Sequence, residues 1–430
     1  MNALRIGIAG LGTVARGVVD LLAAQADHVA RQSGRALTVT RIASRTPRPE
    51  AKLDGAAFST DLESLHGPDV DVVVELIGGE DRALRLVRDA LSRGQSVVTA
   101  NKAIIARHGN ELLASAGERG LGLGFEAAVA GGIPIIGSLT RGLAASRVQT
   151  VAGIINGTSN YILTAMAEQG STFEDALAAA QQLGYAEADP TFDAEGIDAA
   201  HKLSILAALA FDVGFGLEGI FTEGISGVTS EDIGYAAELG YGIKHLGIAR
   251  RAGDGIEARV HPTLVPEQSM LAQVRGVMNA VLIESEAAGP ALFHGAGAGG
   301  SPTASSVVAD LIAVARGEIP GYRVGRKERR MVPMGAVQSA FYLRIPARDA
   351  PGVFGKVARI LGDLEISIEG AVQRERAIRI NGDGGRSSWV PIVILTDVVR
   401  QAVIDSAIAG VQAMPEVVGG IKCMRVEHFD

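Results

Sequence analysis

The feature that most constrains the fold is a glycine turn near the N-terminus, set directly between an apolar strand pattern and a helical pattern. The stretch LRIGIAGLGTVARGVVDLL carries Gly10, Gly12 and Ala15 in a GxGxxA arrangement. Gly10 permits a tight turn, Gly12 lets the backbone approach a pyrophosphate, and Ala15 is small enough for close packing of helix on strand. The N-terminus of the helix also favours an anion. The arrangement predicts a dinucleotide-binding βαβ unit, with a merely tight turn as the alternative.

Strand and helix patterns alternate after this turn, with strand patterns at residues 70–76 and 96–99 around the helical stretch DRALRLVRDALSRG. This alternation predicts an α/β fold with a Rossmann-type, doubly wound parallel sheet over residues 1–133. A longer mixed region, residues 134–320, is expected to form an α+β domain for substrate binding and dimerisation.

The last quarter of the chain reads as a separate unit. At residues 321–339 the hydrophobic pattern lapses and positive charge gathers, which is typical of a linker. Residues 340–430 then show the order strand, helix, strand, strand, helix, strand, which predicts a ferredoxin-like domain able to fold by itself.

Composition excludes several classes of protein. The chain has 430 residues and a net charge of −8 without basic runs, so nucleic acid is not an expected partner. The longest apolar region, residues 203–221, is interrupted by Asp212 and Glu218, which argues against a membrane span. The only cysteine, Cys423, cannot form an intrachain disulfide. With no export signal recognisable at the N-terminus, the cytoplasm is the expected location.

The end of the second predicted strand bears on the choice of cofactor. NAD-specific sites place an acidic residue there to bind the ribose hydroxyls, but this stretch is IASRTPR, with Arg45 and no acid. Arg45 would suit a 2′-phosphate, so we expect NADP, with NAD possible. The alternative is a solvated arginine in a loop.

Three charged residues are candidates for catalysis. Lys102 follows a predicted strand end, where open α/β sheets present ligands. Asp198 and Lys202 are four residues apart on a predicted helix and therefore share a face. Carbonyl reduction needs a proton and a cationic environment for the developing alkoxide, and lysine can supply both. On spacing alone, an ordinary surface ion pair would be the better interpretation of Asp198 and Lys202.

The surroundings of this pair favour a site. Five acidic residues lie within residues 187–198, which suits recognition of a substrate ammonium, although a solvated acidic loop remains the alternative.

Seven blocks give a specific resemblance. In order and spacing, residues 5 to about 318 resemble homoserine dehydrogenases through GIAGLGTVARGV, VVVELIGG, TANKAIIARHG, FEAAVAGGIPII, INGTSNYIL, GYAEADPTFDAEGIDAAHKLSIL and GAGAGGSPTASSVVADLI. The resemblance implies reversible, NAD(P)-dependent reduction of L-aspartate 4-semialdehyde to L-homoserine, in the biosynthesis of threonine, isoleucine and methionine. It also implies that Lys202 donates and accepts the proton, that Lys102 lies where cofactor and substrate meet, and that Asp198 belongs to the catalytic group.

The resemblance implies further binding residues. Those expected to bind homoserine are Gly184, Glu187, Asp193, Asp198 and Thr158. Those expected to bind the nucleotide are Gly10, Gly12, Thr13, Val14, Arg45, Lys102 and Gly300. A site for Na⁺ or another monovalent cation, largely of carbonyl oxygens, is implied at Glu126, Val129, Gly131 and Ile133. From the residues alone, FEAAVAGGIP would be interpreted as a turn.

The C-terminal segment resembles an ACT domain, with ARDAPGVFGKVARIL matching its first turn and ISIEGAVQ its second strand. This resembles the longer, monofunctional homoserine dehydrogenases, and implies L-threonine or a related amino acid as effector. The turn at residues 349–352 would be the ligand edge. Because ACT domains usually bind amino acids where two copies pair, a homodimer or homotetramer is expected.

Two other functions need to be weighed. Aspartate-semialdehyde dehydrogenase acts on the same intermediate but requires a cysteine nucleophile, and Cys423 lies in the wrong domain. A non-enzymatic sensor of nucleotide and amino acid is the second alternative, but it would not need the lysine pair.

Overall fold

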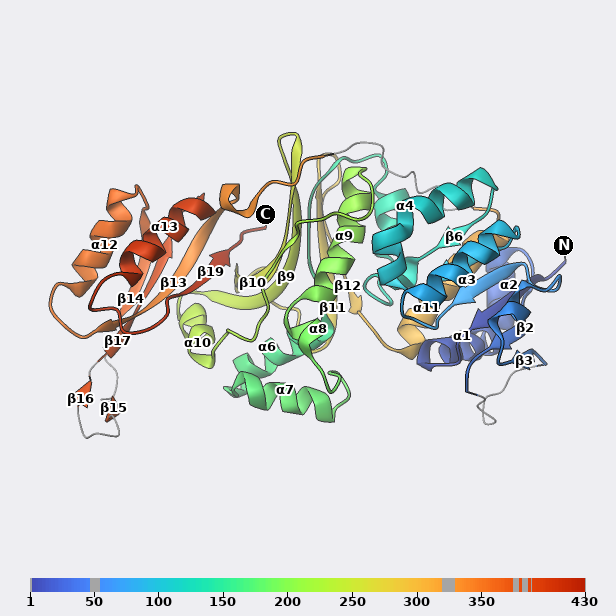
Figure 1. Cartoon of the computed structure of the whole chain (residues 1–430), viewed down its shortest axis with the longest axis horizontal. Coiled ribbons are helices and arrows are strands. Elements are labelled where there is room, and N and C mark those ends of the chain that lie inside the picture. The colour runs from blue at the N-terminus through green and yellow to red at the C-terminus, as the bar shows by residue number, and fades with distance from the viewer. Residues whose placement is uncertain are drawn as a thin grey trace.

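The computed structural model describes residues 2–46, 55–318, 329–373 and 389–429, together with the backbone of residues 379–380 and 386–387. The molecule is elongated, with three parts in a row: a parallel sheet with its helices, a central antiparallel region, and a C-terminal unit (Figure 1). Residues 321–328 of the expected linker lie outside the described residues.

The first sheet is parallel throughout, and its six described strands run in the order β3-β2-β1-β4-β5-β6. Their bounds are β1 Leu4–Ala9, β2 Leu37–Ala43, β3 Ala57–Ser59, β4 Val72–Glu75, β5 Ser96–Thr99 and β6 Leu123–Gly124. The helices are α1 Thr13–Ala24, α2 Ala26–Ser33, α3 Asp81–Ser92 and α4 Lys102–Glu118, with a 3₁₀ turn η1 at Leu62–His66. This order confirms the predicted Rossmann-type sheet.

Alternating side chains explain why the sheet has helices on both faces. Val72 and Val74 point into one apolar cluster, which contains residues of α1, whereas Val73 points into the other, which contains residues of α3 and α4. All three valines are fully buried, as expected for a parallel strand covered on both sides.

A late segment of the chain completes this first part. Helix α11 (Gly300–Ala315) packs on α1, and its Val307, Val308 and Leu311 join the same cluster as Val72 and Val74. The close approach depends on small residues, because a Cβ on Gly17 would lie 2.8 Å from the carbonyl oxygen of Gly300. Residues 300–315, which belong to the expected 134–320 domain, thus pack with the N-terminal part.

The second sheet begins with β7 and has eleven strands among the described residues, while β15 and β16 pair only with each other. Along its main path the order is β12-β11-β7-β9-β10-β19-β13-β17-β14, with β8 paired to β10 and β18 paired to β13. The bounds in the central region are β7 Val148–Ile154, β8 Phe221–Thr222, β9 Tyr241–Ala252, β10 Gly255–Pro266, β11 Met278–Ser285 and β12 Gly289–Ala296.

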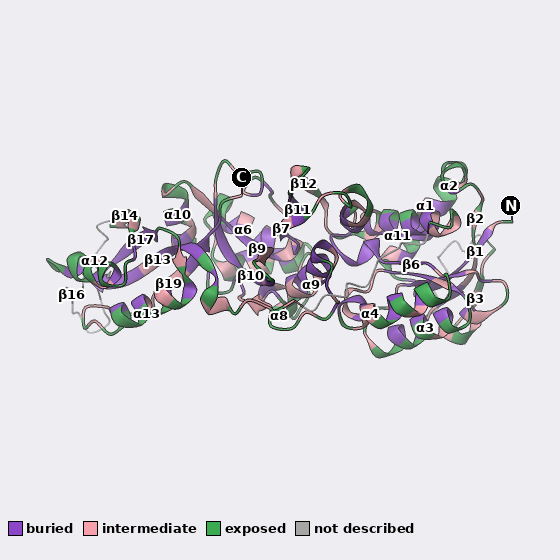
Figure 2. Ribbon diagram, turned by 90° about the horizontal axis from the view of Figure 1, so that it is seen from above, coloured by how far each residue is buried: buried purple, intermediate pink, exposed green. Residues whose placement is uncertain are grey.

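Five helices accompany the central strands. Their bounds are α6 Gly157–Gln169, α7 Phe173–Gln182, α8 Thr191–Ala194, α9 Ile197–Phe211 and α10 Ser230–Glu238, and a short helix α5 (Ile135–Gly137) with the π turn η3 Ser138–Gly142 precedes them. Buried residues lie along the strands and the inner faces of these helices, while exposed residues mark the outer faces (Figure 2). Helix α9 contacts both α4 of the first part and strands β7, β9 and β10, so it lies at the junction where a site can form.

The C-terminal unit has the predicted ferredoxin-like order. Its elements are β13 Gln338–Arg348, α12 Val353–Asp363, β14 Ile368–Gln373, β17 Trp389–Thr396, α13 Gln401–Gln412 and β19 Lys422–Val426. The minor elements are η4 Met334–Ala336, β15 Arg379–Ile380, β16 Arg386–Ser387 and β18 Val399–Arg400. The strand order β19-β13-β17-β14, antiparallel at each step, confirms this part of the predicted fold.

The C-terminal unit is less separate than the sequence suggests. Strand β19 pairs in parallel with β10 through Thr263–Arg425 and Leu264–Val426, so one sheet runs through both parts. Within the expected linker, Met331 forms a bridge to Ile256 of β10, and residues 338–339 already belong to β13. The sequence predicts a unit that folds by itself and gives no sign of this shared sheet. The pairing of β10 with β19 joins residues about 160 positions apart, which no local pattern specifies.

Among the described residues, the structure contains no helix long and apolar enough to span a bilayer.

Candidate active site between the nucleotide turn and helix α9

The glycine turn between β1 and α1 has the geometry that the sequence predicts. Gly10 has a φ of +100°, and a Cβ there would lie 2.7 Å from the carbonyl oxygen of Leu76. A Cβ on Gly12 would meet nothing within 4 Å, whereas Ala15 is buried against the sheet. The turn therefore leaves open space beside Gly12 where a phosphate could approach the backbone.

A cavity of about 450 Å³ opens beside this turn at the carboxyl ends of the parallel strands. It is lined by Gly10, Gly12, Ser44, Arg45, Thr60, Leu76, Gly78, Gly79, Glu80 and Arg82, among others. Arg45 is exposed at its rim, next to the end of β2. The position suits an arginine that meets the ribose end of a dinucleotide.

A second cavity of about 470 Å³ continues toward the central region. It shares Leu76, Gly78, Gly79 and Glu80 with the first and adds Val14, Asn101, Lys102, Phe192 and His201. The two cavities together form one groove, from Arg45 at one end to Lys102 at the other.

Thr13 and Gly300 lie together at the start of α1, next to the glycine turn. Thr13 is the first residue of α1, and a Cβ on Gly300 would lie 3.0 Å from its Cγ2. Thr13 and Gly300 are both expected to bind the nucleotide, and the structure places them side by side although they are far apart in the sequence.

Glu75 supports the loop between the cavities, and the sequence analysis did not single it out. Its carboxylate accepts hydrogen bonds from the backbone N–H groups of Ile77 and Gly78, and from Thr99 Oγ1 at 2.5 Å. Burial raises the pKa of Glu75, while these hydrogen bonds oppose the rise. The only signal in the sequence is an acidic residue at the end of a buried strand.

Asp198 holds both candidate lysines. Its Oδ2 lies 2.7 Å from Lys202 Nζ, one turn further along α9, and its Oδ1 lies 3.2 Å from Lys102 Nζ, at the start of α4. The side chain of Asp198 is only 7% exposed, against 14% for Lys202 and 32% for Lys102. The three residues therefore form a partly buried cluster around a buried carboxylate, rather than the surface ion pair that was the alternative.

The electrostatics of the cluster keep its carboxylate charged. Burial by itself would raise the pKa of Asp198, but the charges of Lys202 and Lys102 and the hydrogen bonds from Lys202 and Asn156 outweigh it and lower the pKa to about 2. Asp198 is accordingly ionised throughout the neutral range.

Two groups that the sequence analysis missed position this cluster. The amide Nδ2 of Asn156 donates to Asp198 Oδ2 and to Asp193 Oδ1, at 2.8 Å each. The backbone oxygen of Ile155 accepts from Lys202 Nζ at 2.8 Å. Asn156 lies two residues beyond the end of β7, and its Oδ1 caps α6 through Ser159 N. The sequence could therefore have predicted a helix cap, but not the contacts 37 and 42 residues away.

The expected substrate residues are only partly brought together. Asp193 reaches the cluster through Asn156, and Thr158, on the first turn of α6, donates to the backbone oxygen of Tyr185 at 2.6 Å. Gly184 has a φ of +74° and is exposed. Glu187 is also exposed, and among the described residues only its backbone oxygen has a hydrogen-bond partner, Gln181.

Phe192 and His201 are further residues at the groove that the sequence did not indicate. Lys102 Nζ lies 5.7 Å from the centre of the Phe192 ring, and the Phe192 and His201 rings meet edge to face. Burial, followed by the charges of Arg107 and Lys102, lowers the pKa of His201. A neutral imidazole and an aromatic ring thus form an uncharged border beside the lysines.

The segment expected to hold a monovalent cation is buried and irregular. Ala130 and Gly131 both have positive φ, and the backbone oxygen of Gly131 accepts from Ser306 Oγ at 2.7 Å. The Glu126 carboxylate accepts from the N–H groups of Ile136 and Gly137.

A second buried carboxyl group adjoins this segment. Asp310 Oδ2 accepts from Glu126 N at 2.8 Å, and burial raises the pKa of Asp310 to about 8. Oxygen atoms here keep free lone pairs, and two buried acids lie side by side, so the donor set fits a hard cation.

Comparison with known proteins gives a consistent result. The family model described as "Homoserine dehydrogenase, NAD binding domain" matches residues 10–126, and the model described as "Homoserine dehydrogenase" matches residues 134–312. The chain is 48% identical over 441 aligned residues to a homoserine dehydrogenase of Pseudomonas aeruginosa, with 100% of both chains covered. Identity to the Neisseria gonorrhoeae protein of the same name is 44%, again over the whole of both chains.

Solved structures agree with this. A homoserine dehydrogenase from Thiobacillus denitrificans is 47% identical and superposes with a TM-score of 0.92 over 100% of this chain and 99% of that one. A hyperthermophilic archaeal homoserine dehydrogenase, solved in complex with NADPH, is 27% identical with a TM-score of 0.64, covering 75% of this chain and 100% of that one.

Proposed function

The chain belongs to the homoserine dehydrogenase family, and we propose that the Asp198 cluster is the place where it carries out the family's reaction. The enzyme is an NAD(P)-dependent oxidoreductase that interconverts L-aspartate 4-semialdehyde and L-homoserine, which rules out the sensor alternative. The observation that carries the proposal is that Asp198 holds Lys102 and Lys202 together where the nucleotide groove meets α9.

Each member of the cluster has a distinct role. When bound, the nicotinamide supplies or accepts the hydride. Lys202 Nζ gives its proton to the aldehyde oxygen during reduction and takes the hydroxyl proton during oxidation, while Lys102 adds a second positive charge beside the developing alkoxide. Asp198 is a positioning residue, because it fixes both ammonium groups and balances their charge.

Substrate recognition follows from the acidic loop. Glu187 and Asp193 would bind the substrate ammonium, and Asp193 is already held by Asn156. Thr158 on α6 donates a hydrogen bond to the backbone oxygen of Tyr185, and Gly184 directly precedes Tyr185 in the chain. Both residues would therefore set the position of this loop. Exposure of Glu187 suits a group that closes on the substrate when it arrives.

The preferred cofactor would be NADP, bound along the groove from Arg45 to Lys102. Gly10, Gly12, Thr13, Val14 and Gly300 would hold its phosphates and neighbouring sugars. The lack of an acid at the end of β2 and the position of Arg45 at the rim support a 2′-phosphate there. That the archaeal relative was solved with NADPH agrees with this choice.

A monovalent cation such as Na⁺ would bind oxygen atoms of Glu126, Val129, Gly131 and Ile133. The ion would neutralise part of the buried charge of Glu126 beside Asp310 and fix the loop that precedes α5. Its role is structural, because this segment contributes no residue to the Asp198 cluster.

The C-terminal unit would act as an ACT-type regulatory domain that responds to L-threonine or a related amino acid, in a homodimer or homotetramer. Its ferredoxin-like order and the helix start at Gly352 after the turn of residues 349–352 support this assignment. The shared sheet through β10 gives a physical route from this unit to the central region.

The activity is tested with purified full-length chain by following NADP reduction with L-homoserine. We expect turnover with L-homoserine and none when L-homoserine is replaced by L-threonine or L-serine. Titration of the same assay with threonine tests regulation, and an effect of several-fold to a hundredfold on apparent affinity is expected for a coupling of about 1–3 kcal/mol. Indifference to millimolar threonine would refute the regulatory part alone.

A further inference from the structure

Three side chains on the outer surface of the nucleotide-binding part converge away from the groove. Glu63 and His66 belong to η1, Asp89 belongs to α3, and none of the three lines either cavity of the candidate site. We propose that Glu63, His66 and Asp89 bind a divalent metal ion, for which Zn²⁺ is the best chemical match.

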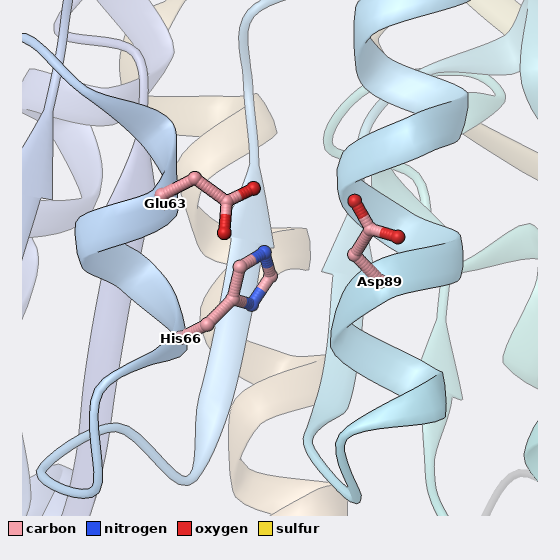
Figure 3. Close-up of side chains that lie close together, drawn as sticks. All are labelled: Glu63, His66 and Asp89. Atoms are coloured by element: carbon pink, nitrogen blue, oxygen red, sulfur yellow. The ribbon is translucent and has the colours of Figure 1, made fainter.

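The backbone places the three groups together. In a 3₁₀ turn, residues three apart project in the same direction, which applies to Glu63 and His66. Figure 3 shows both side chains extending toward Asp89, which reaches back from α3. One ligand atom from each residue lies within 4.8 Å of the other two.

An observation outside the cluster fixes the state of the histidine. The buried amide of Gln95 donates from Nε2 to the backbone oxygens of Leu65 and Val70, at 3.0 Å each. Its Oε1 is therefore the atom that faces His66 Nδ1, at 2.8 Å, so Nδ1 must carry the hydrogen and donate. In the neutral ring Nε2 then has a free lone pair, and a metal-binding histidine is usually held in this way by an oxygen on its other nitrogen.

The donor set selects the kind of ion. One imidazole nitrogen and two carboxylates are ligands that zinc accepts, whereas calcium and magnesium prefer oxygen alone. Bonds of about 2.0–2.2 Å place the ligands of a tetrahedral zinc roughly 3.4 Å apart, so the side chains need to close by at most about 1.4 Å. Glu63 is exposed and can move, and water would complete the coordination.

One existing contact competes with the ion. Arg93 Nη2 lies 3.0 Å from Glu63 Oε2, and both side chains are about half exposed or more. Such a surface pair is weak, so it should reduce zinc affinity only a few-fold. It also gives the proposal a distinctive signature, because removal of Arg93 should strengthen binding.

The test is equilibrium dialysis of untagged, full-length chain against micromolar ZnSO₄ after treatment with a chelator. Wild type should bind one equivalent at this site, and His66→Gln and Asp89→Asn should bind it at least tenfold more weakly. The matched controls are His28→Gln and Asp20→Asn, exposed residues of α2 and α1, which should bind zinc like wild type. Turnover with homoserine shows that each variant is folded.

Arg93→Gln provides the second arm, with an expected several-fold gain in affinity. Zinc should also raise the melting temperature of wild type and the controls but not of Asp89→Asn, because the ion joins η1 to α3 only when folded. The proposal is overturned if wild type binds no zinc at 100 µM, if His66→Gln or Asp89→Asn binds it as well as wild type, or if Arg93→Gln leaves the affinity unchanged.

Discussion

Lys102 Nζ lies 3.2 Å from Asp198 Oδ1, and this contact joins the first residue of α4 in the nucleotide-binding part to α9 in the central part. The ion pair lies where the groove for the cofactor ends. Its geometry therefore couples the placement of the cofactor to the placement of Lys202, the proposed proton-transfer group, which lies on the other oxygen of the same carboxylate.

Asp198→Asn should lower turnover at least tenfold and also raise the Michaelis constant for homoserine. The amide keeps the shape of the side chain but loses the charge that holds both lysines, so orientation and binding suffer together. Steady-state kinetics with varied homoserine measures both constants. The control is Asp212→Asn, the same change at the C-cap of α9, which should leave both kinetic constants near the wild-type values. If Asp198→Asn leaves the homoserine kinetics unchanged, Asp198 does not belong to the site.

Asn156→Ala should reduce kcat/KM for homoserine roughly ten- to a hundredfold, because Asp198 loses a buried hydrogen bond and Asp193 a partly buried one. The variant also loses the cap of α6, which costs about 1 kcal/mol of stability. Thr172→Ala removes the cap of α7 alone and separates the two effects. If both variants lose stability and neither loses activity, Asn156 serves only as a cap.

Arg45→Ala should weaken NADP binding about ten- to a hundredfold while NAD binding changes little, because a charge-assisted contact to the 2′-phosphate is worth roughly 1.5–3 kcal/mol. Fluorescence titration with each reduced cofactor measures the two affinities. NAD acts as the internal control, and equal losses for both cofactors would mean that Arg45 has no contact with the 2′-phosphate.

Arg344→Met should destabilise the chain by on the order of 3 kcal/mol, because it leaves the buried Asp232 without its guanidinium partner. Arg344 belongs to β13 and Asp232 to α10, so this pair ties the C-terminal unit to the central part. Urea unfolding measures the loss, and Arg359→Met, an exposed residue of α12, is the control. If Arg344→Met loses no more free energy of unfolding than Arg359→Met, the Arg344–Asp232 ion pair does not stabilise the chain.

The same pair makes acid stability a test. Burial raises the pKa of Asp232, but the hydrogen bond and charge of Arg344 outweigh it, so the folded pKa lies below the ordinary value of 3.8. The contribution is therefore present above about pH 3.8 and is lost as the pH falls through the folded pKa. Without Arg344, only the hydrogen bonds from Thr229 oppose the effect of burial, so the pKa of Asp232 should be higher and acid unfolding should begin at a higher pH than in wild type.

The sequence predicts those parts of the molecule that depend on neighbours along the chain. The turn at Gly10 and the shared face of Asp198 and Lys202 follow from spacing alone, and both predictions of local structure are confirmed. The contacts of Asn156, the return of α11 to the first sheet and the pairing of β19 with β10 are long-range. No local pattern specifies them, because they depend on how whole elements pack.

The central claim is that Lys202 transfers the proton, and Lys202→Met tests it most directly. The variant keeps a side chain of similar length without the ammonium, so NADP affinity should stay within about twofold while turnover with homoserine falls by roughly 10²- to 10⁴-fold. Turnover and cofactor affinity are measured on the same preparation, with circular dichroism to confirm folding. A variant that retains more than half of the wild-type turnover number would contradict the assignment of Lys202.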